Sequence, residues 1–198
     1  RPDPAHPSIV VGVARLDQRA TRLRLIAGTT QPDTSHWQLG AQVPPDARSR
    51  LGATFNSGFK MADAPGGSLI DGHIIGALRL GAAAVAIHRD GTATVGQWGR
   101  DVTAAPDVIT VRQNLDLIVD QGVPTAELAD NTGNRWGTSK NQKQYTWRSG
   151  LGIDAAGNLL YVGGANLNLT TLAAALVQAG WRASHISDSG PNKVRPEM

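Results

Sequence analysis

A short polar segment, Asn56-Ser57-Gly58, follows a mostly apolar stretch and offers the groups of a ligand site. The preceding residues 51–55 predict a short buried strand. Gly58 permits a positive φ and a close backbone approach, and the Asn56 amide supplies both a donor and an acceptor. Asn, Ser and Gly are also ordinary turn residues. The segment is therefore either a tight turn between strands or one wall of a ligand site.

Five more polar residues lie at the ends or turns of predicted strands, where they could meet this segment. They are Asp71, Asn114, Asp120, Arg148 and Asp188. With Asn56 they supply one guanidinium, two amides and up to three carboxylates. Arginine binds an anion through paired hydrogen bonds, and a carboxyl group can serve as general acid or base at a glycosidic bond. The set predicts a site for a phosphorylated or acidic sugar, although Asp71 and Asp120 individually are typical turn residues.

Other kinds of chemistry find little support in the sequence. The five histidines show no HxH or HxxxH spacing, so no metal site is predicted, and the absence of cysteine excludes thiolate chemistry. No glycine-rich nucleotide loop follows a strand, and Ser57 does not lie in a GxSxG elbow. The sequence therefore requires no cofactor, while a divalent cation remains open.

Composition indicates a globular protein of modest charge. The chain has 198 residues, which suits a single domain, with 40% hydrophobic and 18% charged residues and a net charge of +3. It contains no run of Lys or Arg and no apolar run of membrane-spanning length, so neither nucleic acid nor a membrane span is expected. The abrupt start at Arg1-Pro2 suggests an internal cut, with any export signal lying upstream.

The elements that position these residues are mostly short strands. Alternating or continuous apolar residues predict strands at 8–16, 21–27, 51–55, 68–70, 74–80, 83–88, 92–95, 108–111, 116–119, 151–153 and 159–162. Hairpins are expected at Asp71-Gly72, at Asp90-Gly91 and over residues 154–158. One helix is expected over 170–181, with Asn168 or Thr170 as its N-cap and Gly180 at its end. Residues 130–144 are polar and predict a loop or a lid.

These elements predict an α+β fold, with a mixed, mostly antiparallel β-sheet core and few helices packed on it. We expect a single domain over 1–198, in which 1–50 supply N-terminal strands and a loop and 51–190 form the core that carries the motifs.

The order of the motifs resembles the phosphodiester glycosidase family. The family's Asn-Gly-Gly-Phe is similar to Asn56-Ser57-Gly58-Phe59, and its glycine-rich segment and Asp-Gly hairpin are similar to Gly66-Gly67 and Asp71-Gly72. Its later motifs are similar to segments that begin at Asn114 and at Arg148, to the predicted helix, and to Asp188-Ser189-Gly190. The resemblance spans residues 53–190, and the amino-acid sequence of several segments is similar to that of actinobacterial members.

The resemblance implies a secreted or cell-envelope hydrolase that cleaves a sugar-1-phosphodiester and releases a sugar and a phosphomonoester. In that reading Arg148 holds the phosphate, assisted by Asn56 and the backbone near Gly58, and Asp188 and Asp120 are the acid and base candidates. Asn114, Ser57 and Asp71 complete the substrate-binding set. Arg148→Ala is then expected to abolish activity and leave the fold intact.

Two alternatives stay open. Ser57 and Ser189 stand where the family has glycine, and the closing motif differs further. A non-catalytic carbohydrate-binding or envelope module of the same fold is one alternative, and a glycosidase without phosphate specificity is the other. Each would take a carbohydrate or sugar phosphate as its partner.

Overall fold

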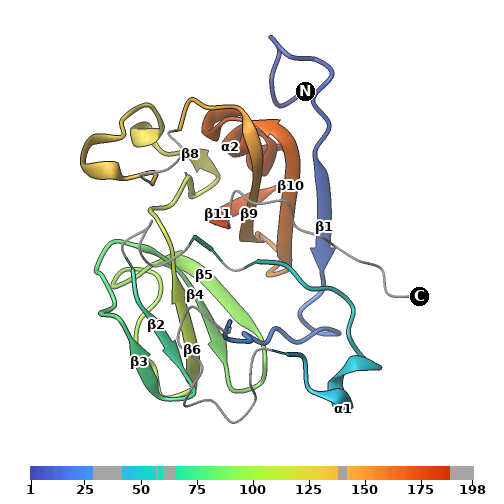
Figure 1. The fold of residues 1–198 in the computed structure, drawn as a ribbon, viewed down its shortest axis with the longest axis vertical. Coiled ribbons are helices and arrows are strands. Elements are labelled where there is room, and N and C mark those ends of the chain that lie inside the picture. The colour runs from blue at the N-terminus through green and yellow to red at the C-terminus, as the bar shows by residue number, and fades with distance from the viewer. Residues whose placement is uncertain (29–41, 57, 60–65, 138–141, 188–198) are drawn as a thin grey trace.

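The computed structural model describes residues 1–28, 42–56, 58–59, 66–137 and 142–187. Their strands form two sheets in which every ladder between strands is antiparallel. In Figure 1 the larger sheet and helix α2 occupy the upper part of the molecule, and the smaller sheet occupies the lower part. The predicted α+β class with mostly antiparallel sheets and few helices is confirmed.

The larger sheet has six strands in the order β1-β10-β9-β11-β7-β8. Their bounds are β1 Gly12–Leu16, β10 Leu159–Leu167, β9 Thr146–Asp154, β11 Trp181–Ser187, β7 Val119–Asp120 and β8 Val123–Pro124. The predicted strand at 116–119 is thus reduced to the short β7. The strands predicted at 151–153 and 159–162 are the inner parts of β9 and β10, which extend further because their ladder continues to Thr146.

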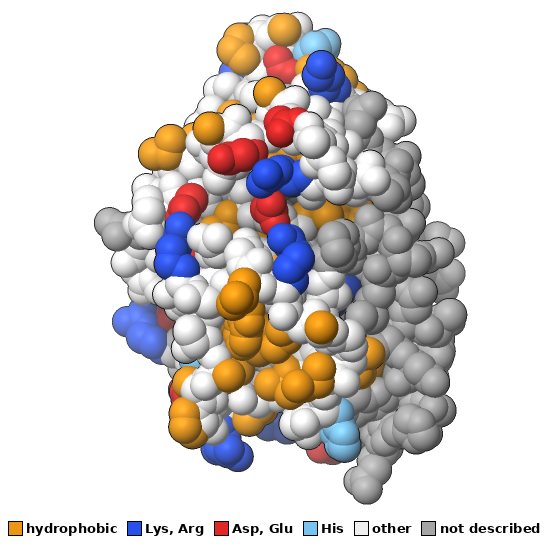
Figure 2. Space-filling model, turned by 90° about the vertical axis from the view of Figure 1, so that its left-hand side faces the viewer, with side chains coloured by type: hydrophobic (Ala, Val, Ile, Leu, Met, Phe, Trp, Pro, Cys, Tyr) orange, Lys and Arg blue, Asp and Glu red, His pale blue; other side chains and the backbone are white. Residues whose placement is uncertain are grey.

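The smaller sheet has five strands in the order β3-β2-β6-β4-β5. Their bounds are β3 His73–Ile75, β2 Ser68–Ile70, β6 Val108–Gln113, β4 Ala83–His88 and β5 Ala93–Gln97. Asp71 and Gly72 have φ of 48° and 84° between the paired Ile70 and His73, so the predicted two-residue hairpin is confirmed. Figure 2 shows hydrophobic side chains gathered in the lower half of one face of the molecule, and Ile74 is 68% exposed.

Helix α2 (Leu169–Gln178) packs on the larger sheet. The Asn168 side chain accepts a hydrogen bond from Thr171 N at 2.8 Å, which makes Asn168 the N-cap, and Gly180 follows the helix with φ +89°. Leu172 and Leu176 are fully buried against side chains of β10 and β11. The other helical segments are short: α1 Pro45–Arg48, η1 Ala126–Ala129 and η2 Thr132–Asn134.

Two predicted strands are wrong. Residues 21–27 and 51–55 join neither sheet and have no regular strand structure. The alternation that suggested the first strand is real, because Leu23 and Leu25 pack against the core between the sheets while Arg22 and Arg24 are exposed. An alternating pattern reports which side is buried, but a strand also needs a partner for its backbone. Residues 51–54 are exposed, so the predicted burial of that segment is also wrong.

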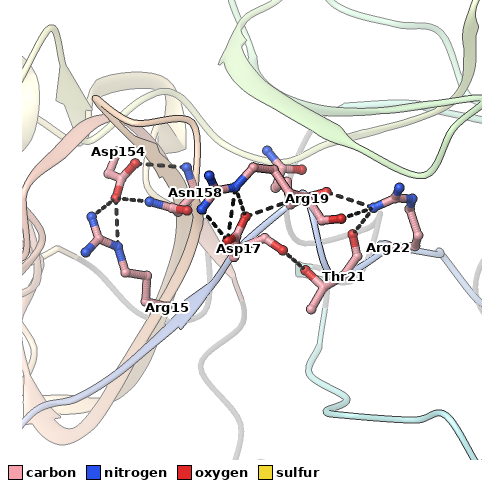
Figure 3. Close-up of polar contacts among 8 residues, drawn as sticks. Arg15, Asp17, Arg19, Thr21, Arg22, Asp154 and Asn158 are labelled. Atoms are coloured by element: carbon pink, nitrogen blue, oxygen red, sulfur yellow. Dashed lines mark hydrogen bonds and ion pairs between the residues drawn. The ribbon is translucent and has the colours of Figure 1, made fainter.

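The turn between β9 and β10 is organised by the buried carboxylate of Asp154. Its Oδ1 accepts hydrogen bonds from Ala156 N and Asn158 N at 2.9 and 2.8 Å, and its Oδ2 accepts from Asn158 Nδ2 and Arg15 Nε, each at 2.9 Å. Figure 3 shows Asp154 between Arg15 and Asn158. Burial opposes ionisation, but the hydrogen bonds from Asn158 and Arg15 outweigh it and lower the pKa of Asp154 from 3.8 to about 2.

Asp154→Asn is expected to lower the free energy of unfolding by about 1–3 kcal/mol at pH 7, since charge-assisted hydrogen bonds are lost. Because the folded-state pKa is depressed, this contribution is present above pH 4 and is lost as the pH falls toward 2. Urea unfolding of both proteins at pH 7, 4 and 2.5 measures it. A gap between the two proteins that stays constant down to pH 2.5 would contradict the assignment.

Candidate functional site

Gly58 lies against the end of β6, where it meets Asn114 and Arg112. Its φ is +141°, and a β-carbon at this position would lie 3.2 Å from Asn114 Cγ and 3.5 Å from Arg112 Nη2. Asn114 is itself buried and donates its backbone N–H to Ala83 O at 3.1 Å, which fixes it to β4. Two residues from the predicted set, Gly58 and Asn114, are therefore brought together, and the backbone at Gly58 requires glycine.

We expect Gly58→Ala to distort this junction. The left-handed backbone and the close approach to Asn114 together are expected to cost about 1–3 kcal/mol of stability. The matched control is Gly72→Ala, because Gly72 also has a positive φ, +84°, with nothing within 4 Å of an added β-carbon. Thermal unfolding of the two variants compares the costs, and equal shifts would show that the contact with Asn114 is unimportant.

Arg112, on β6, is the cationic group of this junction. Its Nη2 donates to Phe59 O at 2.8 Å and its Nη1 donates to Gln113 O. No carboxylate among the described residues lies within ion-pair distance of it. Burial lowers the pKa of Arg112 below its ordinary value, yet an arginine remains charged at neutral pH. Two backbone carbonyls thus hold a half-buried cation that lacks a protein counter-ion in the described chain.

Gly58 and Arg112 both line a cavity of about 920 Å³ that lies between the two sheets. The smaller sheet contributes two cross-strand rows to it. Ser68, Arg112 and Val85 are paired in one row, and Ile70, Thr110 and Ile87 in the next. Side chains at alternate positions share one face of a sheet, so these six point to the same side. Leu151 and Leu159 of the larger sheet also line the cavity.

The cavity has a marked imbalance of charge. Its described lining includes four arginines, Arg22, Arg24, Arg50 and Arg112, and no Asp or Glu. Arg22 is engaged with the carbonyls of Gln18 and Thr21 at 2.8 and 2.9 Å. A low-dielectric cavity with charges of one sign concentrates counter-ions of the opposite sign. The arrangement therefore suits an anionic ligand.

Asn56 is exposed and also lines this cavity, so three predicted residues, Asn56, Gly58 and Asn114, lie at or next to it. Ser57 and Asp188 lie outside the described residues. Asp71 lies far from Asn114. Its backbone N–H donates to Ile109 O, next to the Ile70–Thr110 pair of the ladder, whereas Asn114 follows the other end of β6. At about 3.3 Å per residue the five positions from 109 to 114 span roughly 16 Å.

Asp120 lies on β7 and forms an ion pair with Arg100. Both oxygens accept from the Arg100 guanidinium at 2.8 Å, and Arg100 also binds Asp101. Asp116, two residues after Asn114, is similarly held by Arg79 at 2.6 Å and Arg135 at 2.8 Å. Figure 2 shows acidic and basic side chains interleaved in a band above the hydrophobic surface. A role for Asp120 as acid or base stays a prediction.

Arg148 lies on β9 within the core and is 1% exposed. Its Nε donates to Leu167 O at 3.0 Å and its Nη2 to Gln144 O at 3.1 Å. Burial lowers its pKa to about 10. Arg148 is not among the described residues that line the cavity. Its role as phosphate holder stays a prediction, and its contacts indicate that it also supports the fold.

Arg112 and Ser68 are site residues that the sequence reasoning missed. The strand was predicted to end at Val111, whereas β6 continues to Gln113. With the longer strand, Thr110 and Arg112 stand at alternate positions of β6 and so share one polar face. Ser68 carries no such signal, because a serine within a short apolar strand is usual.

The described residues contain no group of three or more His, Asp or Glu arranged to hold a metal ion. In the same part of the chain, no helix has the length and apolar character needed to cross a bilayer.

Comparison with solved structures finds a similar fold. The catalytic domain of zebrafish N-acetylglucosamine-1-phosphodiester alpha-N-acetylglucosaminidase, solved in a form auto-inhibited by its pro-peptide, aligns at a TM-score of 0.52 with 18% identity, over 68% of this chain and 50% of that chain. The likeness is one of fold. A hypothetical protein from Synechocystis aligns at a TM-score of 0.40 with 15% identity, over 93% of this chain and 51% of that chain. No protein-family model and no curated protein sequence matches the chain, which spans about half the length of the two structures.

Proposed function

We propose that the protein is a hydrolase that cleaves a sugar-1-phosphodiester of a glycan or cell-envelope polymer. Water adds across the glycosidic C1–O bond: its oxygen goes to C1 and a proton goes to the phosphate oxygen, so a sugar and a phosphomonoester are released. The observation that carries the proposal is the meeting of Gly58, Asn114 and Arg112 at a cavity rich in arginine. The distant likeness in fold to a phosphodiester glycosidase catalytic domain is consistent with it.

Arg112 supplies the phosphate-binding group in this proposal. Its guanidinium is oriented by Phe59 O and Gln113 O and has no ion-pair partner in the described chain, so a ligand anion would be its counter-ion. Arginine is suited to this because its planar fork can form two parallel hydrogen bonds with phosphate oxygens. Asn56, exposed at the cavity, supplies a donor and an acceptor for sugar hydroxyls.

Asp188 is the preferred candidate for the acid or base, since Asp120 is already bound by Arg100 through both oxygens. An Asp120→Asn exchange is expected to change stability by less than about 1 kcal/mol, because exposed ion pairs contribute little. Asp188→Asn is expected to lower kcat at least 100-fold. If Asp120→Asn abolishes turnover and Asp188→Asn does not, the roles are reversed.

Turnover of a chromogenic sugar-1-phosphodiester, compared with the plain glycoside of the same sugar, tests the function. We expect hydrolysis of the phosphodiester at least 100-fold faster than that of the plain glycoside, because only the former offers Arg112 an anion. Equal rates on both substrates would favour a glycosidase without phosphate specificity.

One observation favours a second candidate, a binding module of the same fold without catalysis. The described residues that line the cavity include no carboxylate, so they offer anion binding without an acid or base. Saturable binding of the sugar phosphodiester without product release would support this candidate. In either case we propose a secreted or cell-envelope location.

A further inference from the structure

The cavity beside Arg112 changes character along the smaller sheet. In the first row Ser68 and Val85 flank Arg112, and in the second row Ile70 and Ile87 flank Thr110. Each row has one hydroxyl, but the first adds the Arg112 cation and one valine, while the second adds two isoleucines. One end of this wall therefore suits a charged group and the other suits hydrocarbon.

Ser68 strengthens the polar end. It is fully buried, and its Oγ has no hydrogen-bond partner among the described residues. A buried hydroxyl without a partner is costly, typically by about 1–3 kcal/mol, and calls for an explanation. Ser68 stands directly opposite Arg112 in the ladder and lines the cavity. A phosphate oxygen bound there would give Arg112 a counter-ion and the Ser68 hydroxyl an acceptor.

The apolar end is enclosed from several directions. Leu151 and Leu159 approach from the larger sheet, and Leu23, Leu25 and Phe55 approach from the two segments that cross between the sheets. Most of the described side chains that line the cavity are apolar, as is usual for small-molecule sites of about 300–1,000 Å³. A sugar alone would bring many hydroxyls to these walls without partners for them.

The exposed part of the cavity lining carries positive charge. Arg24 and Arg50 line the cavity and are exposed, and neither has an ion pair with any described carboxylate. Two such charges attract anions from solution and repel cations of the same size and hydrophobicity. These exposed charges and the charge of Arg112 thus select the same sign of ligand.

We infer that the ligand of this cavity is an amphiphilic phosphate, in which a phosphate ester is joined to a hydrocarbon group. The phosphate contacts Arg112 and Ser68, and the hydrocarbon extends along Ile70, Ile87 and the facing leucines. This inference rests on the proposed function, which places the phosphate at Arg112. It narrows the proposed substrate to a sugar phosphodiester whose other ester group is a hydrocarbon, in place of the glycan or polymer of the general proposal.

Calorimetric binding of alkyl phosphates tests the inference without requiring turnover. The probes are methyl, butyl, hexyl and octyl phosphate, each below its micelle concentration. Affinity is expected to rise at least about twofold per added methylene, and so by about 100-fold from methyl to octyl phosphate. Octyltrimethylammonium, a cation with the same chain, is expected not to bind. Equal affinities across the series, or equal binding of the cation, would overturn the inference.

Two variants locate the ends of the ligand. Ser68→Ala removes the unpartnered hydroxyl and is expected to weaken every alkyl phosphate about 5- to 10-fold without lowering the thermal midpoint. Thr110→Phe places a ring between Ile70 and Ile87 and is expected to remove most of the advantage of octyl over methyl phosphate. Arg89→Met is the control, because Arg89 is exposed and is not among the residues that line the cavity. A dependence on chain length that survives in Thr110→Phe would contradict the placement of the hydrocarbon.

The two proposals fail separately. If binding depends on chain length but no sugar phosphodiester is hydrolysed, the proposed hydrolase activity is wrong and the amphiphilic phosphate ligand is supported. If sugar phosphodiesters are hydrolysed at the same rate with and without a hydrocarbon group, the hydrolase activity is supported and the amphiphilic phosphate ligand is wrong.

Discussion

Replacing Arg112 by methionine is expected to lower kcat/KM on a sugar-1-phosphodiester about 100-fold. The guanidinium provides charge-assisted hydrogen bonds to the phosphate, which are typically worth about 1.5–3 kcal/mol each, and a half-buried cation is screened little by water. Methionine keeps an apolar stem of similar length, so the β6 ladder with Ser68 and Val85 is retained. The hydrogen bonds to Phe59 O and Gln113 O are lost, and we expect the thermal midpoint to fall by only a few degrees.

Two companion variants separate charge from geometry. Arg112→Lys keeps the positive charge and loses the planar fork, so its kcat/KM is expected to lie between those of the parent protein and Arg112→Met. Arg89→Met removes an exposed arginine away from the cavity and is expected to leave kcat/KM unchanged. Full activity in Arg112→Met with an unchanged fold would show that this cavity does not hold the phosphate.

The sequence correctly predicted turns and helix caps, which depend on interactions between neighbouring residues. Asp71-Gly72 adopts the positive φ values of a tight hairpin, and Asn168 caps the helix that ends near Gly180, because turns and caps depend on a few adjacent residues. The strands predicted at 21–27 and 51–55 failed because pairing depends on distant partners. Leu23 and Leu25 are directed inward as expected, but none of the described strands forms a ladder with their segment.

The site was predicted in part for the same reason. Gly58 and Asn114 were chosen for their residue types, and the structure places them in contact. Residue type does not reveal burial or existing partners, so the sequence could not show that Asp120 is held by Arg100. Arg112 was not predicted because the strand was expected to end at Val111, two residues too early. Arg112 therefore seemed to lie outside the strand face that it shares with Thr110.

Arg148→Ala is expected to destabilise the protein by about 3–5 kcal/mol, which for a chain of this size lowers the thermal midpoint by about 10 °C. The side chain is 1% exposed and donates to Leu167 O and Gln144 O, so its removal leaves a cavity and carbonyls without those donors. These contacts lead to a different expectation from that of the sequence, which predicted an intact fold in this variant. Loss of activity in Arg148→Ala alone would not identify a phosphate holder, because the scaffold would be weakened as well.

Arg148→Met separates the two roles of Arg148. It retains much of the buried volume and loses only the hydrogen bonds and the charge, so it is expected to cost about 2 kcal/mol, clearly less than alanine. If Arg148 acts through the fold, activity measured well below the thermal midpoint is largely retained in Arg148→Met. A stable Arg148→Met protein that has lost turnover, while Arg112→Met retains it, would return the phosphate to Arg148 and move the site away from the cavity.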